Sequence, residues 1–408
     1  MTTAGDSELE QLRSVDSADV VRSGRVAATL RRTRDGVEFR YRDYWVDQQR
    51  PPVATTLPVS REPVLRPGGA LPAYFAGLLP EGRRLGALRR AVKTSADDEL
   101  SLLLAVGADA IGDVQVVPAG FAPHEVPPRI AIENIAEVSF AELLAELGIR
   151  AQRMALPGVQ DKTSAAMINL PLARAGERYI LKLNPLGEYP HLIENEAFFL
   201  DAARLSGLTV PPHQLATDRA GAAGLLVRRF DRITVDGELR ALAVEDGCQA
   251  ADRPPADKYL LGTNRTFAGL TAVCDAPAAA GRELLRQLAF AYLTGNGDAH
   301  AKNFSVLRDV LGEWRVSPVY DTPCSHVYGD TTMAMSINGR SGSDFGATDF
   351  AELGKSLGVP ERATRRALSE LVERVDRWLP NLDSLPFDRG QLSKLRRVIA
   401  HRRARLLS

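Results

Sequence analysis

The polar stretch Gly295–Asn303 constrains the fold of this chain most, because it separates a helical pattern from a strand pattern. Residues 284–293 carry apolar side chains at helical spacing, and residues 304–307 read as a strand that pairs with residues 314–317. Within the stretch, Asp298 stands five positions before Asn303. Phosphoryl-transfer enzymes use Asp and Asn at this spacing, because the carboxylate orients the attacking hydroxyl and the amide oxygen holds a metal ion. The stretch therefore predicts a catalytic loop.

Asp321 follows Asn303 by 18 residues and stands directly after the apolar exit of the next strand. Mg²⁺ prefers a small number of hard oxygen ligands, so Asn303 and Asp321 form a candidate metal site. The residues alone leave two other interpretations open. Gly, Asn and Asp are the common residues of polar turns that have no function, and Asp298 with His300 would also suit a metal-dependent hydrolase.

Lys182 is an anomaly in the otherwise apolar strand pattern of residues 179–183. Burying an ammonium group is costly unless it is paired with an opposite charge. The helix predicted over residues 193–206 supplies carboxylates, and Glu196 is the favoured partner, with Glu194 in reserve. The alternative is a lysine on an edge strand whose ammonium reaches the solvent.

The loop at residues 156–162 carries one glycine, Gly158, and leads into a strand predicted over residues 163–170. Backbone N–H groups of such a loop can bind phosphates, although one glycine is too few for a Walker or a Rossmann loop, and a plain hairpin is the alternative. Glycine loop, strand lysine, helix glutamate, Asp-x-x-x-x-Asn and strand-exit aspartate follow one another in the order that a protein kinase needs. This order is more informative than any one of the five signals.

The predicted fold class is α+β, with a two-lobed, protein-kinase-like fold behind a small β-rich N-terminal subdomain. Strand patterns dominate before residue 243 and helical patterns after it, and the last 60 residues predict three amphipathic helices. The predicted divisions are a flexible leader (1–22), the N-terminal subdomain (23–130), a strand-rich N-lobe (131–243) and a helical C-lobe (244–408).

Charge and cysteine content limit the possible partners and location. The chain has 51 basic and 51 acidic residues, so any contact with nucleic acid must come from a local patch. Its three widely spaced cysteines do not suit a disulfide framework and favour a reducing compartment. Neither a secretory signal nor a membrane-spanning apolar run is evident. We therefore expect a soluble cytoplasmic protein with no membrane partner.

The motifs together resemble the HipA family of serine/threonine kinases, which are the toxin halves of bacterial toxin–antitoxin pairs. The pattern Gly-Asn-x-Asp-x-His-x-Lys-Asn at residues 295–303 is specific to this family and its near relatives. The resemblance extends over nearly the whole chain. Further matching segments are residues 77–82, 102–118, 157–162, 180–183, 194–196, 227–232, 245–249, 254–259 and 320–321. The first two resemble the family's small N-terminal subdomain, which has no direct catalytic role.

The resemblance implies a role for each candidate residue. Asp298 would be the catalytic base, with His300 and Lys302 beside it in the loop and Lys302 near the γ-phosphate. Asn303 and Asp321 would hold Mg²⁺. The residues implied to bind ATP are Gly158, Val159, Gln160, Lys162, Lys182, Glu196, Arg228, Arg229 and Phe230, the last three along the hinge beside adenine.

Three departures from the family pattern concern regulation and the hinge. Ala155 stands where many members carry a serine, so an off-switch by autophosphorylation at that residue is closed to this chain. Arg228 replaces a common hinge glutamate, and Val244 replaces a histidine. The predicted catalytic set is complete, which speaks against an inactive kinase.

The resemblance also implies partners. These are a helix-turn-helix antitoxin, operator DNA only within their complex, and a protein substrate, with aminoacyl-tRNA synthetases among the family's substrates. The last helix is strongly basic, and either caps the fold as a solvated helix or supports contact with DNA. Its basic residues are Arg389, Lys394, Arg396, Arg397, Arg402, Arg403 and Arg405. Two other functions stay open: a non-catalytic kinase-fold co-regulator of a repressor, and a kinase for a lipid or small metabolite.

Overall fold

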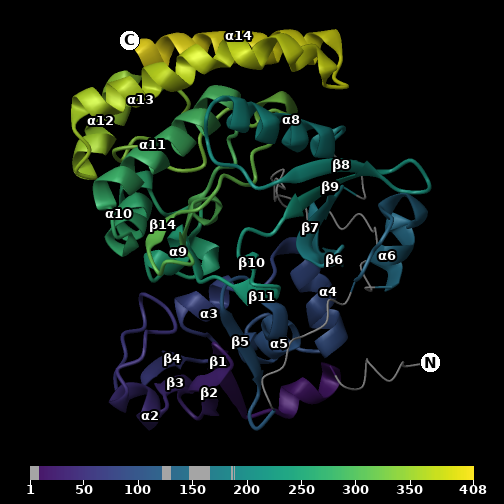
Figure 1. The fold of residues 1–408 in the computed structure, drawn as a ribbon, viewed down its shortest axis with the longest axis vertical. Helices are drawn as coiled ribbons and strands as arrows, with labels where there is room; N and C mark the ends of the chain where they lie inside the picture. The colour runs from purple at the N-terminus through teal and green to yellow at the C-terminus, as the bar shows by residue number, and fades with distance from the viewer. Residues whose placement is uncertain (1–8, 122–129, 147–165, 185–186, 188) are drawn as a thin grey trace.

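The computed structural model describes residues 9–121, 130–146, 166–184, 187 and 189–408. Figure 1 shows three parts: an N-terminal subdomain at the bottom, a strand-rich lobe at the right and a helical lobe at the top. Strands and helices are both abundant and are segregated into these parts, so the predicted α+β class is confirmed. No helix of the described residues is both long and apolar enough to cross a membrane.

The N-terminal subdomain is built on a five-stranded antiparallel sheet in the order β4-β3-β2-β1-β5. Its strands are β1 (Ser17–Arg22), β2 (Arg25–Thr33), β3 (Gly36–Tyr41), β4 (Val64–Pro67) and β5 (Val114–Pro118). Its helices are α2 (Asp43–Asp47), α3 (Ala73–Gly77), α4 (Gly82–Val92) and α5 (Glu99–Val106). Phe39, Phe75 and Leu103 are completely or almost completely buried between the sheet and the helices.

The predicted flexible leader over residues 1–22 is wrong for its last part. β1 lies between β2 and β5 and is hydrogen-bonded to both, so it belongs to the interior of the sheet. Ala18 and Val20 are fully buried, and they form the alternating apolar pattern of a strand with one face on the core. The acidic residues around them concealed this short pattern.

The N-lobe is a four-stranded antiparallel sheet in the order β6-β7-β9-β8. Its strands are β6 (Ile168–Arg174), β7 (Glu177–Leu183), β8 (His213–Thr217) and β9 (Ala223–Arg228). The helix α6 (Phe140–Glu146) and the helix α8 (Leu192–Leu205) contribute to two separate apolar clusters on this sheet. Ile130 and Ile132 already belong to the N-lobe core. The boundary between the N-terminal subdomain and the N-lobe therefore lies between the end of β5 and residue 130.

The C-lobe is mainly helical and surrounds the long, largely buried helix α11 (Pro277–Thr294). Its other helices are α9 (Gly247–Ala250), α10 (Thr263–Val273), α12 (Ala347–Ser356), α13 (Glu361–Glu373) and α14 (Arg389–Leu407). The predicted hairpin is confirmed as β13 (Ser305–Arg308) with β14 (Trp314–Val316), and β12 (Val244–Asp246) adds a third strand beside it. A separate ribbon, β10 (Arg232–Val235) with β11 (Glu238–Ala241), follows β9. The last three helices are those that the sequence predicts.

The basic residues of α14 are largely occupied within the C-lobe. Arg402 is almost fully buried and donates a hydrogen bond to the carbonyl oxygen of Tyr292, 2.5 Å away, near the end of α11. The ion pairs of three others are Arg396–Asp383 at 2.6 Å, Arg403–Asp376 at 2.6 Å and Arg405–Asp344 at 2.9 Å. These contacts favour the interpretation of α14 as a helix that caps the fold.

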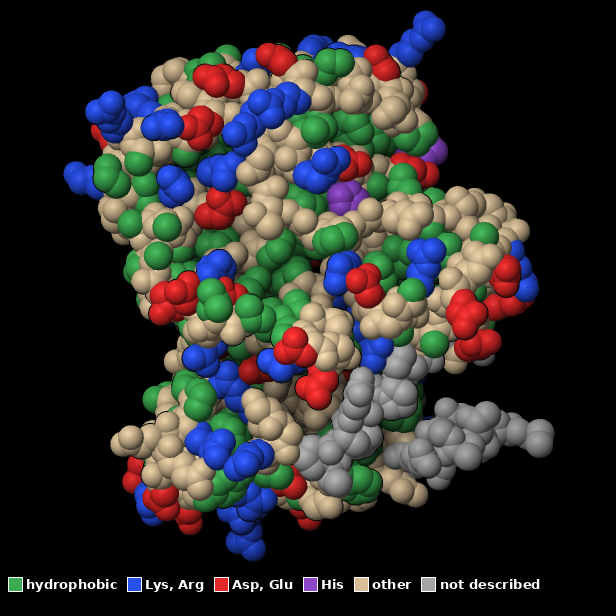
Figure 2. Space-filling model, viewed as in Figure 1, with side chains coloured by type: hydrophobic (Ala, Val, Ile, Leu, Met, Phe, Trp, Pro, Cys, Tyr) green, Lys and Arg blue, Asp and Glu red, His purple; other side chains and the backbone are tan. Residues whose placement is uncertain are grey.

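The N-terminal subdomain meets the rest of the chain at a narrow junction where acidic and basic side chains gather (Figure 2). One buried contact there joins Glu245 of β12 to Thr55, whose backbone N–H and hydroxyl donate to the two carboxylate oxygens at 2.8 and 2.5 Å. Burial raises the pKa of Glu245 to about 7. The junction therefore contains a carboxyl group that takes up a proton in the folded protein near neutral pH.

We expect Glu245 to make the stability of the protein fall as the pH rises from about 4.5 to about 7. In this interval the folded protein holds a proton that the unfolded chain has released, because the pKa is raised from 4.5 to about 7 on folding. Replacing Glu245 with Gln should flatten this dependence by up to about 3 kcal/mol in the free energy of unfolding. Urea titrations of both proteins between pH 5 and 8 measure the difference, and parallel curves would refute the expectation.

Candidate active site

The predicted catalytic loop begins where α11 ends. Gly295 follows the helix with a φ of +77°, a left-handed conformation that ends helices and that glycine adopts without strain. The loop is then held by its own and by neighbouring side chains. The backbone N–H of His300 donates to Oδ1 of Asn303 at 2.9 Å, and the N–H of Gly297 donates to Oγ of Ser325 at 2.7 Å. The loop is buried except for the partly exposed Lys302, and these hydrogen bonds hold its backbone.

Asn296 joins the loop to the strand exit at Asp321. Its Oδ1 accepts a hydrogen bond from the backbone N–H of Asp298 at 3.1 Å, and its Nδ2 donates to the carbonyl oxygen of Asp321 at 3.0 Å. The Asn303 amide also donates to Oδ2 of Asp321 at 3.1 Å. The three predicted residues Asp298, Asn303 and Asp321 are therefore tied into one site, although residue 321 lies beyond a hairpin. Asn296 has no predicted role, although its place two residues before Asp298 is a usable signal.

Asp321 itself has a positive φ of +53°, which non-glycine residues seldom adopt. Such conformations persist only where the surrounding structure holds them in place, and they are concentrated at functional sites. Here the holding contacts are those from Asn296 and Asn303 and an ion pair with Lys182. The carboxylate of Asp321 is therefore aimed by the site around it.

Lys182 lies inside the protein and is 4% exposed. Its ammonium donates to Oε1 of Glu196 at 2.5 Å and to Oδ1 of Asp321. The predicted pairing of Lys182 with Glu196 is therefore confirmed. Glu194, the reserve candidate, lies beside His191 instead. One lysine of β7 thus bridges a carboxylate of α8 and the strand-exit aspartate of the C-lobe.

The two carboxylates of this bridge keep the ammonium group of Lys182 charged. Burial works against a charged ammonium, but Asp321 and Glu196 outweigh it and raise the pKa of Lys182 above its ordinary value. Burial raises the pKa of Glu196, whereas Lys182 overcomes the effect of burial at Asp321 and lowers the pKa of that carboxyl. Asp321 is therefore ionised at neutral pH and is available as an oxygen ligand.

Asp298 is oriented by Tyr259, a residue without a predicted role. The phenol of Tyr259 donates to Oδ1 of Asp298 at 2.8 Å, and its ring meets the His300 ring edge to face at a centroid distance of 5.1 Å. Burial and the charge of Lys258 lower the pKa of His300 to about 4, so this imidazole is neutral at pH 7. The neutral ring of His300 lies against Tyr259, and the role of Asp298 as the catalytic base stays a prediction.

Lys302 lies in the catalytic loop as predicted, but its ammonium contacts the N-terminal subdomain. It lies 2.8 Å from Oε1 of Glu81, and it donates to the carbonyl oxygen of Gly77 at 3.2 Å. Asp246 lies 3.8 Å away. The predicted contact of Lys302 with a γ-phosphate stays a prediction, and its observed partners come from α3 and the start of α4.

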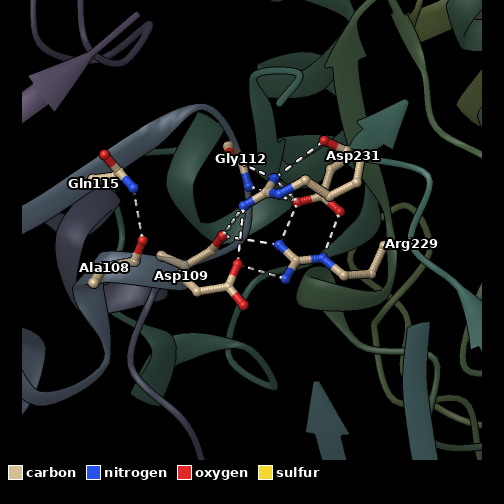
Figure 3. A network of polar contacts seen from close by, with 8 residues as sticks. Ala108, Asp109, Gly112, Gln115, Arg229 and Asp231 are labelled. Atoms are coloured by element: carbon tan, nitrogen blue, oxygen red, sulfur yellow. Dashed lines mark hydrogen bonds and ion pairs between the residues drawn. The ribbon is translucent and has the colours of Figure 1, made fainter. Parts of the chain in front are cut away.

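The predicted hinge residues have different surroundings. Arg228 ends β9 and forms an ion pair of 2.7 Å with Glu177, and the Phe230 ring lies 5.8 Å from the ring of Tyr320. Arg229 is buried, and its side chain reaches Asp109 of the N-terminal subdomain at 3.0 Å and Asp231, two residues further along its own segment, at 2.8 Å (Figure 3). The side chain of Arg229 therefore serves the junction between domains, which leaves only its backbone for the predicted nucleotide contact.

The donor set of the site fits Mg²⁺ better than a hydrolytic metal centre. One carboxylate, from Asp321, and one amide, from Asn303, are hard oxygen donors that phosphate oxygens would complete. The described ranges contain no group of three or more His, Cys, Asp or Glu side chains that could hold a metal ion. The alternative pairing of Asp298 with His300 in a metal hydrolase consequently has no third ligand among those residues.

The predicted phosphate loop lies outside the described residues. It comprises Gly158, Val159, Gln160 and Lys162, and Ala155 lies in the same segment. Their assignment to ATP phosphates stays a prediction. Lys182 and Glu196 are the predicted nucleotide-binding residues that the structure brings to the catalytic loop.

Comparisons with known proteins agree with this geometry. The family model of the HipA-like C-terminal domain matches residues 154–379, and that of the HipA N-terminal domain matches residues 18–117. The protein Y4mE of Sinorhizobium fredii is 31% identical, over 93% of this chain and 96% of its own. The serine/threonine-protein kinase toxin HipA of Shewanella oneidensis is 27% identical, over 92% and 90%.

A solved structure extends the comparison to the fold. The complex of HipA, HipB and operator DNA from Shewanella oneidensis contains a chain that matches with a TM-score of 0.74 at 23% identity, over 96% of both chains. The match covers the N-terminal subdomain and both lobes. The predicted two-lobed, protein-kinase-like fold is confirmed.

Proposed function

The chain belongs to the HipA family of kinases, and from this premise we propose that it transfers the γ-phosphoryl group of Mg·ATP to a serine or threonine hydroxyl of another protein. The observation that carries the proposal is the convergence of Lys182, Glu196 and Asp321 beside the loop of Asp298 and Asn303. These residues come from β7, α8, the segment that follows β14 and the catalytic loop. Their assembly supplies a cation for phosphates, oxygen ligands for Mg²⁺ and a carboxylate for the acceptor.

Each residue of the site has a proposed task. Lys182 would bind the phosphates, with Glu196 holding its ammonium in place. Asn303 and Asp321 would hold Mg²⁺, which supplies charge neutralisation on the phosphates when bound. The phenol of Tyr259 fixes the carboxylate of Asp298, which would orient the acceptor hydroxyl and take its proton. Positioning and charge neutralisation account for most of the lowering of the barrier in such transfers.

We propose that the partners follow the same family. The related complex contains HipB and operator DNA, and a helix-turn-helix antitoxin is the expected partner here. Because α14 has ion pairs and a buried arginine within its own lobe, DNA would be reached mainly through that partner. A protein substrate, with aminoacyl-tRNA synthetases as the first candidates, would connect transfer to growth arrest. The three cysteines are unpaired and buried, which suits a cytoplasmic location.

One labelling experiment separates this function from the alternatives. The protein is incubated with γ-labelled ATP, Mg²⁺ and lysate of its host cell. We expect a discrete labelled protein whose phosphate is on serine or threonine. Label in the lipid or small-molecule fraction would favour a metabolite kinase. A lack of any label together with repressor binding would favour the non-catalytic co-regulator and would refute our proposal.

A further inference from the structure

Glu81, at the start of α4 in the N-terminal subdomain, binds two lysines of the C-lobe. Its Oε1 lies 2.8 Å from Nζ of Lys302, and its Oε2 accepts a hydrogen bond from Nζ of Lys258. The two lysines come from different segments of the C-lobe and are 44 positions apart. One carboxylate thus joins two segments that otherwise carry like charges.

Both lysines are next to residues of the candidate active site. Lys258 precedes Tyr259, which donates to Asp298, and the carbonyl oxygen of Lys258 accepts a hydrogen bond from the backbone N–H of Ala301 at 3.2 Å. Lys302 precedes Asn303, the proposed metal ligand. A displacement of either lysine would therefore move a group that the chemistry uses.

The position of Glu81 is fixed from both sides. A Cβ atom added at Gly77 would lie 2.8 Å from the side chain of Gln249, so the end of α3 is in close contact with α9. The side-chain amide of Gln249 also donates to the carbonyl oxygen of Tyr74 at 2.8 Å. On the other side, Ala87 of α4 packs into the apolar core of the N-lobe. Glu81 therefore lies between α3, which contacts the C-lobe, and α4, which packs into the N-lobe, and it is the residue that precedes α4.

The charges of Lys302 and Lys258 favour the ionised carboxylate of Glu81. Burial favours the neutral carboxyl, but Lys302 and Lys258 outweigh it and hold the pKa of Glu81 at about 2. The side chains of Lys302 and Lys258 are 14% and 17% exposed, so neither ammonium is fully solvated. Without Glu81, Asp246 would be the remaining carboxylate beside Lys302, at 3.8 Å. The repulsion between the two partly buried ammonium groups beside the catalytic loop would then be costly.

We propose that Glu81 is a positioning residue through which the N-terminal subdomain completes the catalytic loop. The inference rests on the proposed kinase function and adds a task for the subdomain, which the resemblance alone left without a catalytic role. Glu81 acts through its two lysines: it fixes Tyr259 and thus Asp298 on one side, and Asn303 on the other. Errors of about 1 Å in such positions reduce rates by up to about 100-fold.

The test compares three variants of the full chain. Glu81→Gln removes the charge at nearly constant shape, and Glu81→Asp keeps it. Asp252→Asn is the matched control, because it breaks another contact between the same domains, the ion pair of 3.1 Å between Arg66 and Asp252, which involves neither lysine and no residue of the loop. We expect Glu81→Gln to lower kcat about tenfold with little change in KM for ATP, Glu81→Asp to recover part of the loss, and Asp252→Asn to keep the wild-type kcat.

Amide hydrogen exchange of residues 296–303 supplies a readout that needs no activity. We expect faster exchange in Glu81→Gln and unchanged exchange in Asp252→Asn. If the wild type transfers no phosphate, the proposed function fails, and the exchange data still decide the role of Glu81. An unchanged or increased kcat in Glu81→Gln, an equal loss of kcat in Asp252→Asn, or unaltered exchange of the loop would overturn the inference.

Discussion

Replacing Asp298 with Asn is expected to reduce phosphoryl transfer by about 10³-fold, while ATP binds with nearly the wild-type affinity. The substitution keeps the size of the side chain and an oxygen that can accept the hydrogen bond from Tyr259. It removes the negative charge that orients the acceptor hydroxyl and takes its proton, a contribution worth about 10²–10⁴ in rate. Single-turnover transfer to the labelled protein substrate measures the rate of the chemical step.

We expect the loss of activity to come from the Asp298 carboxylate itself and not from the removal of one negative charge from the protein. Asp201→Asn is a suitable control, because Asp201 is an exposed acid on α8 whose ion pair with Arg204 lies on the surface. We expect this control to transfer phosphate at the wild-type rate. If Asp298→Asn retained more than about a tenth of the activity, Asp298 would not be the base that this chemistry requires.

The part of the site that could be predicted from the sequence depends on chemical anomalies. A lysine inside an apolar strand demands an opposite charge, and Glu196 is the observed partner. Asp298 and Asn303 are close in sequence, so local turn geometry alone brings them together. Asp321 was predicted from its position after a strand, although the observed strand β14 ends five residues before it, at Val316. Only Lys182 conflicted with its local surroundings, whereas Asp298, Asn303 and Asp321 were predicted from their spacing and their order along the chain.

The contacts that could not be predicted are made by ordinary residues over long separations. Glu81 opens a helix, where acidic residues are common for electrostatic reasons, and nothing in its neighbourhood indicates that its partner is Lys258, 177 positions away. Arg229 stands in the hinge pattern, yet it pairs with Asp109, 120 positions earlier. Such pairs are decided by how the domains pack, which no local pattern records.

The same limit explains the errors in the fold. The strand β1 is short, and its buried face is defined by its position between β2 and β5, not by its own sequence. The strand β12 has only three residues and was not predicted, because its stability comes from pairing with β13. By contrast, the strand β7 and the helix α8 carry their own periodicity, and their predicted ranges, 179–183 and 193–206, agree with the observed ones within two residues. The strand predicted over 163–170 overlaps β6 in part.

Replacing Asp321 with Asn should remove the dependence of ATP binding on Mg²⁺. Asn tolerates the positive φ of +53° at this position, and its amide oxygen can still accept from Asn303, so the local backbone should persist. The lost negative charge is the proposed main attraction for the metal ion, since the remaining predicted ligand, Asn303, is neutral. Affinity for Mg·ATP should fall at least about tenfold.

The decisive measurement is ATP affinity with Mg²⁺ and with EDTA, in the wild type and in Asp321→Asn. Mg²⁺ should tighten binding in the wild type and have little effect in the variant. Affinity in EDTA should be similar in both proteins or higher in the variant, because Asp321 no longer competes with the phosphates for the ammonium of Lys182. An equal gain from Mg²⁺ in both proteins would place the metal ion elsewhere. It would also leave the positive φ of Asp321 and its contacts with Lys182, Asn296 and Asn303 without the metal-binding function that we propose for this residue.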